Sequence, residues 1–279
     1  MLSLLLFQRI AELFLIIFMG WLVVKVGILK TEDSRCLSMI LLYIIAPSVF
    51  FNAFQIERTP EVLSMMAFSA VLALISNVLL ILLGDLSAKL LHLDVVEEAS
   101  IIYPNSGNMA IPLVSAIFGT EWVVFVTLYN MIQNLFVWTH CRMFVSGERK
   151  VSLRKILLNI NILAILAGAL MFFLNIQLPG IVHNALTSVG NMIGPAAMII
   201  VGMLMADLKM EDLRAYRRIW KPTLFRLVVL PLALVLLAKL LHISALNPQG
   251  ETLVMTALIP AFAPAANVVA QFSQIYGRD

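Results

Sequence analysis

The sequence predicts an all-α integral membrane protein, because long apolar segments dominate it and charged residues are few. Of its 279 residues, 61% are hydrophobic and 13% are charged, whereas about 25% are charged in a typical soluble domain. The apolar residues fall in blocks long enough for a helix of roughly 20 residues to cross the hydrocarbon core, and they do not alternate as barrel strands do. Two of these blocks are interrupted by prolines among small and polar residues, which is unusual for a segment in lipid.

The apolar blocks predict nine membrane spans joined by short loops. The expected spans cover residues 4–28, 37–55, 62–84, 99–118, 121–145, 156–177, 184–206, 222–242 and 252–275. Most Lys and Arg residues lie at one set of span ends, which the positive-inside rule assigns to the cytoplasm. We therefore expect a multi-pass protein of the cell membrane with its N-terminus outside and the loop 146–155 in the cytoplasm.

The spans also show an internal repeat. Gly20 precedes Pro47 by the same number of residues as Gly168 precedes Pro195, and the apolar residues around each pair correspond. The two proline-broken spans follow in the same order, at a slightly larger shift. A shared order of this kind favours a duplicated unit.

The repeat unit contains five spans, and this odd number has a consequence for topology. A second copy of an odd unit enters the membrane from the opposite side, which predicts an inverted repeat. Residues 1–150 are expected to form the first five-helix repeat, and residues 151–279 a second repeat that lacks its fifth helix. A tenth span would complete the second copy, and we favour truncation of the sequence over loss of this helix.

The first broken span contains Pro104, followed by Asn105, Ser106, Gly107 and Asn108. Proline cannot donate an N–H group, so we expect the helix to break here and to leave free N–H groups where its second half begins. Such groups, together with the helix dipole, favour an anion such as a carboxylate, and the neighbouring amides and hydroxyl can add hydrogen bonds. The alternative is a proline kink whose polar groups bind a neighbouring helix.

The second broken span contains Pro260 and Pro264, with Asn267 and Gln271 beyond them. Asn267 and Gln271 are four residues apart, so both can lie on one helix face and contribute to the same site. The alternative is again a packed kink, in which the intervening alanines allow neighbouring helices to approach closely.

Other polar residues also lie within the expected spans. Asn130, Gln133 and Asn134 share one face of the fifth span, where they could line a cavity or bind neighbouring helices. Arg226 lies inside the eighth span. We favour a side chain that extends to the cytoplasmic headgroups, with a counter-ion for an anionic substrate as the alternative. The expected substrate-binding residues are Pro104, Asn105, Ser106, Asn108, Pro260, Asn267 and Gln271, and the candidate cavity-lining residues are Asn130, Gln133, Asn134 and Arg226.

Several classes of function lack support in the sequence. Cys36 and Cys141 fit no metal-binding spacing, and no metalloprotease motif, nucleophile elbow or phosphate-binding loop is present. We therefore expect no cofactor or metal, and an intramembrane enzyme is the weaker class. The net charge of +3 is small and its basic residues adjoin apolar segments, so nucleic acid is not an expected partner.

Four segments together resemble the auxin efflux carrier family. They are the opening from Gly20 to Pro47, the run Tyr103-Pro104-Asn105 with Gly107 to Pro112-Leu113, the segment Gly190–Gly202 with Pro195, and the closing segment Pro260–Gly277. The resemblance extends over essentially the whole chain. The family includes plant auxin exporters and bacterial permeases for malate and other dicarboxylates.

The resemblance implies a ten-helix inverted repeat whose fourth and ninth helices cross at their prolines, with the substrate beside the crossing. By position, Pro104 and Asn105 match the first crossing segment and Pro260 matches the second. The resemblance also implies that spans 1, 2, 6 and 7 form a scaffold and that spans 3–5, 8 and 9 belong to a moving transport domain.

These observations predict a secondary transporter that moves small organic anions, auxin-like or dicarboxylate such as malate, by alternating access. Its expected partners are the anion, the lipid bilayer, a proton or sodium ion as coupling ion, and a second copy of the chain in a homodimer. The first alternative is a sodium- or proton-coupled carrier similar to bile-acid symporters. The second is a membrane-embedded enzyme or a binding protein.

Overall fold

The computed structural model describes residues 2–147, 158–208 and 219–277, and within these ranges the regular secondary structure is helical. The expected all-α class is therefore confirmed for the described part of the chain. The chain forms two compact units. Unit 1 comprises Met1–Ile56, Pro112–Glu121 and Ile160–Arg217, and unit 2 comprises Glu57–Ile111, Trp122–Asn159 and Arg218–Asp279.

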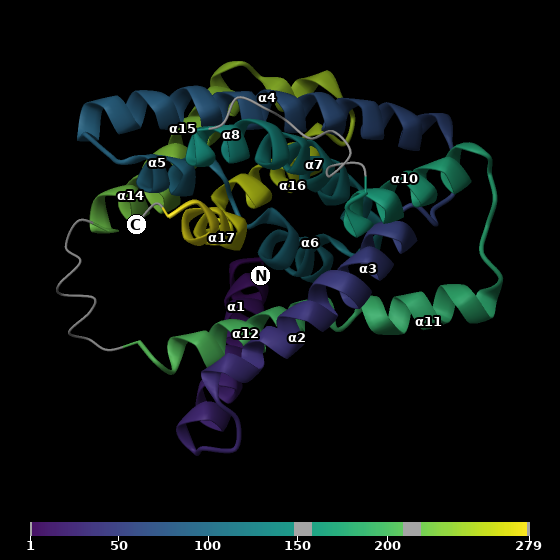
Figure 1. The fold of residues 1–279 in the computed structure, drawn as a ribbon. Coiled ribbons are helices and arrows are strands. Elements are labelled where there is room, and N and C mark those ends of the chain that lie inside the picture. Colours follow the sequence, from purple (N-terminus) through teal and green to yellow (C-terminus); the bar gives the residue numbers. More distant parts are fainter. Residues whose placement is uncertain (1, 148–157, 209–218, 278–279) are drawn as a thin grey trace. The chain divides into compact units, whose positions relative to one another are not determined.

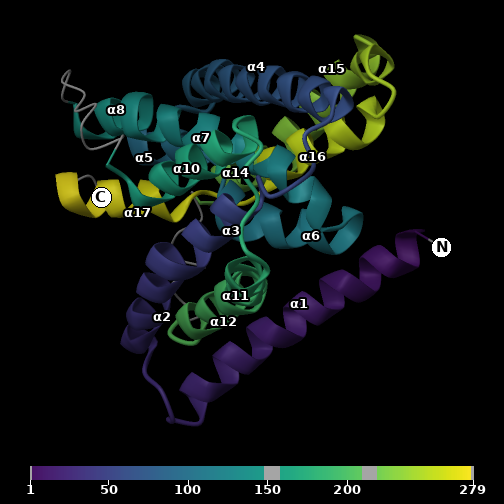
Figure 2. The same ribbon diagram turned by 90° about the vertical axis from the view of Figure 1, so that its right-hand side faces the viewer.

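Unit 1 is built from the helices of expected spans 1, 2, 6 and 7. Its elements are α1 (Leu2–Lys25), η1 (Thr31–Asp33), α2 (Ser34–Ile40), η2 (Leu41–Ile45), α3 (Ala46–Asn52), α10 (Ile160–Phe173), α11 (Gly180–Gly190) and α12 (Ile193–Met205). Most of α6 (Ile111–Phe118), the second half of the expected fourth span, also falls in this unit, as does most of η4 (Thr120–Trp122). Figure 2 shows α1 running alongside α12, and α3 packs against α10 and α11.

Glycines allow the helices of unit 1 to approach to backbone contact. A Cβ atom on Gly20 of α1 would lie 2.3 Å from the carbonyl oxygen of Ile199 in α12. A Cβ atom on Gly168 of α10 would lie 2.8 Å from the carbonyl oxygen of Phe51 in α3. The shift in sequence that carries Gly20 onto Gly168 also carries Phe51 onto Ile199, so one shift relates the two contacts to each other. Small residues serve this purpose because helices in lipid associate through close packing.

Unit 2 is built from the helices of expected spans 3, 5, 8 and 9 and the first half of span 4. Its elements are α4 (Pro60–Leu91), α5 (Val95–Ile102), η3 (Ser106–Ala110), α7 (Val123–Phe136), η5 (Val137–Cys141), α8 (Arg142–Ser146), α14 (Trp220–Leu224), η7 (Phe225–Val229), α15 (Leu230–Leu240), η8 (Ile243–Leu246), α16 (Gly250–Phe262) and α17 (Asn267–Tyr276). Helix α4 packs against α5, α7 and α16 (Figure 1), and the buried side chains between them include Leu80, Ile101 and Tyr129.

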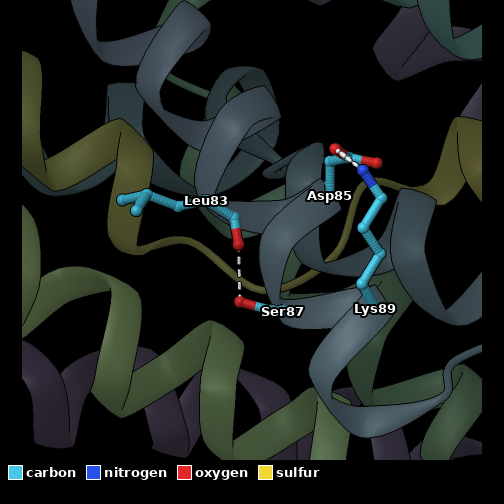
Figure 3. A network of polar contacts seen from close by, with 4 residues as sticks. All are labelled: Leu83, Asp85, Ser87 and Lys89. Atoms are coloured by element: carbon cyan, nitrogen blue, oxygen red, sulfur yellow. Dashed lines mark hydrogen bonds and ion pairs between the residues drawn. The ribbon is translucent and has the colours of Figure 1, made fainter.

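Helix α4 continues seven residues beyond the expected end of the third span at residue 84. Its last turns carry polar side chains that find partners within the helix (Figure 3). Lys89 forms an exposed ion pair with Asp85 at 2.7 Å, and Ser87 donates to the carbonyl of Leu83 at 2.5 Å. The apolar pattern marked only the first part of α4, and these local bonds stabilise the polar last turns that follow it.

Four described helices are long and apolar enough to cross a membrane. They are Thr31–Asn52, Pro60–Leu91, Gly180–Met205 and Trp220–Leu240. They coincide with expected spans 2, 3, 7 and 8. Two shorter apolar helices, Ile160–Phe173 and Gly250–Phe262, overlap expected spans 6 and 9.

Three helical segments contain a π-helical turn just before a proline. Elements η2, η3 and η7 end two residues before Pro47, Pro112 and Pro231, respectively. A proline ring would clash with the carbonyl four residues earlier in an α-helix, and proline has no N–H to offer that carbonyl. A wider turn ahead of the proline relieves this conflict, and helical structure continues through each of these prolines. The π-helical turn η5 has no such proline after it.

Candidate functional site

Two helix breaks lie side by side in unit 2. One separates α5 from η3, and the other separates α16 from α17 (Figure 1). The extended residues between them pair, since Pro104 and Ala265 form an isolated antiparallel bridge. The N–H of Asn105 donates to the carbonyl of Pro264 at 2.7 Å, and the N–H of Ala266 donates to the carbonyl of Tyr103 at 2.9 Å. We call residues 103–105 and 263–266 the paired breaks.

The two hydrogen bonds of the paired breaks are related by a local two-fold arrangement. Exchanging Pro104 with Ala265 also exchanges Tyr103 with Pro264 and Asn105 with Ala266, which turns each bond into the other. Each break is then followed directly by a helical segment, η3 or α17. The structure thus brings together two segments that are far apart in the sequence.

The second break, expected between Pro260 and Pro264, lies at the end of this range rather than at Pro260, the residue that the resemblance matches to the crossing. Pro260 is buried inside α16, which continues to Phe262, and the residues that pair with the first break are Pro264 to Ala266. Pro264 has no N–H to donate to the carbonyl of Pro260. That carbonyl instead accepts from the N–H of Ala263 at 3.2 Å, and the helix ends there.

Side chains on one face of α7 bind the first break. Gln133 donates from its Nε2 atom to the carbonyl of Pro104, and Asn130 donates from its Nδ2 atom to Oγ of Ser106 at 3.0 Å. Asn134 in turn donates to Oδ1 of Asn130 at 2.6 Å. The three amides that share a face in the sequence thus form a connected series of hydrogen bonds beside Pro104, and Asn130, Gln133 and Ser106 are buried.

Gly107 is the residue that allows η3 to approach α7 so closely. A Cβ atom at this position would lie 2.7 Å from Nδ2 of Asn130, the atom that donates to Ser106. The glycine therefore serves close approach at this point.

The structure contradicts the expectation that Arg226 extends to the membrane surface. Its side chain is 2% exposed and lies within unit 2, in the π-helical turn η7. Its Nη1 atom donates to the carbonyl of Ile101 at 2.8 Å. Its Nη2 and Nε atoms donate to the carbonyls of Ala261 and Ala263, at 2.7 and 2.9 Å. Arg226 therefore binds the main chain next to both breaks.

Tyr129 and Tyr103 are site residues that were not among those expected from the sequence. Oε1 of Gln133 and the hydroxyl of Tyr129 are buried without a hydrogen-bond partner among the described residues. Tyr129 lies four residues before Gln133, and this spacing on a helix could have identified it. Tyr103 places its hydroxyl 2.6 Å from Nδ1 of His140, a pairing between spans that no local pattern predicts.

The remaining expected site residues divide into two groups. Pro104 is buried and Asn105 is half-buried at the first break. The side chains of Asn108, Asn267 and Gln271 lie outside the described part of the structure, although their main chains belong to η3 and α17. The described residues contain no cluster of three or more His, Cys, Asp or Glu side chains that could hold a metal ion.

Comparison with known proteins assigns the chain to a family. No curated protein matches it. The family model described as "Membrane transport protein" matches residues 5–151, more than half of the chain, including the first break and the amides of α7. The chain therefore belongs to the membrane transport protein family, the auxin efflux carrier family, whose members are membrane transporters rather than enzymes.

Proposed function

We propose that the protein is a secondary transporter of small organic anions and that the paired breaks hold the carboxylate of the substrate. The observation that carries this proposal is the antiparallel pairing of the breaks, which starts two helical segments, η3 and α17, beside each other. The N–H groups in the first turn of a helix have no partners within the helix and point outward. Two such ends close together form a place where an anion is favourable.

The charges around the paired breaks also suit an anion. Each helix N-terminus carries roughly half a positive elementary charge. The described hydrogen bonds of the paired breaks and of the adjoining Ser106 involve main-chain, amide, hydroxyl, imidazole and guanidinium groups, and none of them involves a carboxylate. A substrate carboxylate at this place would therefore meet donors without a competing acidic side chain.

Several side chains are candidates for contact with the substrate. Asn105 is half-buried beside Pro104 and makes no described side-chain bond. Oε1 of Gln133 and the hydroxyl of Tyr129 are buried without partners among the described residues, and a buried polar group of this kind gains stability from a hydrogen-bonding ligand. Asn108, Asn267 and Gln271 are additional substrate-binding residues in this proposal, because they lie in the first turns of η3 and α17 or just beyond.

We assign the movement of alternating access to unit 2 and the scaffold role to unit 1. The paired breaks and their described hydrogen-bond partners all belong to unit 2, so a substrate held there would travel with that unit. The equivalent contacts of Gly20 with Ile199 and of Gly168 with Phe51 support an inverted repeat. The concentration of Lys and Arg at one set of span ends supports an orientation in the cell membrane with the N-terminus outside.

Flux measurements in proteoliposomes test this proposal. Purified protein is reconstituted, and uptake is measured for a panel of radiolabelled monocarboxylates, aromatic carboxylates and dicarboxylates including malate. We expect saturable uptake of at least one class, and a loss of uptake in Asn105→Ala and Pro104→Ala. Asn184→Ala, an exposed position on α11 of unit 1, is the matched control and should transport as the wild type does.

The same vesicles identify the coupling ion. Uptake that requires an inward sodium gradient or a pH gradient would favour a sodium- or proton-coupled carrier, and uptake without either would favour a uniporter. Ligand binding to the purified protein with no flux under any gradient would contradict transport and favour a binding protein.

A further inference from the structure

We propose that Arg226 is a positioning residue whose guanidinium ties the C-terminal ends of α5 and α16 together and so fixes the geometry of the paired breaks. This inference deepens the proposed function, because it concerns how the proposed site is held. Its central test nevertheless requires no substrate.

The carbonyl of Ile101 at the first break has lost its helical donor. In a continuous helix the carbonyl of Ile101 would accept from the N–H of residue 105. The N–H of Asn105 is instead bound to the carbonyl of Pro264 across the paired breaks. The carbonyl of Ile101 therefore depends on Nη1 of Arg226, at 2.8 Å.

Carbonyls at the second break also lack donors within their helix. The carbonyls of Ala261 and Ala263 lie at the end of α16, where the helix supplies no further donors. Nη2 and Nε of Arg226 donate to them at 2.7 and 2.9 Å. One side chain thus satisfies carbonyls of both helices, which are more than 150 residues apart in the sequence.

The positive charge of Arg226 is balanced by the two helix ends that it contacts. A cation buried inside a membrane protein is costly unless it is compensated. Each helix C-terminus carries roughly half a negative elementary charge. Two such ends meet at Arg226, so together they balance about one positive charge. The guanidinium has no described carboxylate partner and, by this count, needs none.

The planar shape of the guanidinium suits this three-carbonyl contact. Arginine presents its donors in a fixed planar fork, whereas a lysine ammonium is a compact point charge with rotatable donors. Three donors of Arg226 bind three carbonyls from two chain segments at once. Rotation of one helix end relative to the other would break at least one of these bonds, so the fork fixes both ends.

Amide hydrogen exchange measured by mass spectrometry tests the proposal directly. In Arg226→Ala, the N–H groups of Asn105 and Ala266, which bridge the paired breaks, should exchange at least about tenfold faster, since bonds to a charged donor are lost. Peptides from α1 and α12 of unit 1 should exchange as in the wild type. Lys239→Ala, an exposed cation at the end of α15 in the same span, is the matched control and should leave exchange at both breaks unchanged.

Chemical rescue separates positioning from a general loss of stability. Guanidinium ion at tens of millimolar should slow exchange at both breaks of Arg226→Ala toward the wild-type rate, and tetramethylammonium chloride at the same concentration should not. In vesicles that transport, guanidinium should also restore uptake by the variant. The KM should change more than kcat if the fork orients the proposed anion site.

The outcomes are decisive in either direction. Wild-type exchange at both breaks in a folded Arg226→Ala variant overturns the proposal, and so does a failure of guanidinium to slow the faster exchange. If Arg226→Ala does not fold, Arg226→Lys serves, because it keeps the charge but loses the fork. Faster exchange confined to the breaks supports the proposal, and wild-type exchange overturns it. Because exchange is measured without substrate, failure of the transport proposal would not be mistaken for failure of this one.

Discussion

Asn130 donates a hydrogen bond to Ser106 at 3.0 Å, and this bond joins the middle of α7 to the first turn after a broken helix. The contact forms because the next residue, Gly107, has no side chain. The absence of a side chain at Gly107 therefore allows Asn130 to approach. Asn130 in turn holds Ser106, the residue that follows the first of the paired breaks.

Gly107→Ala should disturb this contact. Its Cβ atom would lie 2.7 Å from Nδ2 of Asn130, so Asn130 would have to move away from Ser106. Overpacking of this kind costs about 1–3 kcal/mol, and we expect lower thermal stability in detergent and slower uptake in vesicles. Gly180→Ala is the control, because nothing lies within 4 Å of a Cβ atom there. Uptake by Gly107→Ala at the wild-type rate would contradict the assignment of this contact to the site.

Gln133 offers a test of donor chemistry. Gln133→Met should leave the carbonyl of Pro104 without its donor, at a cost of about 1–3 kcal/mol in unfolding free energy. Gln133→Glu also removes the donor and adds a negative charge beside the proposed anion site. We therefore expect the glutamate variant to show the larger increase in KM at neutral pH. Equal KM values for the two variants would argue against a carboxylate bound near Gln133.

The glycines of unit 1 test the repeat. Gly20→Ala and Gly168→Ala would each bring a Cβ atom within 3 Å of a carbonyl oxygen on the facing helix. Because the two contacts are equivalent, both variants should lose stability by a similar amount, about 1–3 kcal/mol, as measured by thermal unfolding in detergent. A large loss in one variant and none in the other would mean that the two halves of unit 1 are not packed equivalently.

The ion pair at the end of α4 should matter little. Lys89 and Asp85 are both exposed (Figure 3), and an exposed pair of this kind is screened by water and salt. Lys89→Ala should therefore unfold at the wild-type temperature at both low and high salt, with unchanged uptake. A marked, salt-dependent loss of stability would show that this part of α4 is less solvated than its exposure indicates.

Local chemistry explains which features the sequence could predict. Pro104 and Pro264 weaken a helix whatever its surroundings. The spacing of Asn130, Gln133 and Asn134 places their side chains on one face of any helix. Local chemistry could not predict the exact residue at which the second helix breaks. Pro260 and Pro264 are both local helix breakers, and the choice between them depends on which residues can pair with Tyr103 and Asn105.

By itself, the sequence determined the all-α membrane class, the family and the position of the first break, because apolar length and the missing N–H of proline act within a few residues. The tertiary structure alone decided the pairing of Pro104 with Ala265 and the role of Arg226. A long cationic side chain can reach either headgroups or unpaired carbonyls. That choice follows from where the ends of α5 and α16 meet, which depends on contacts between residues far apart in the chain.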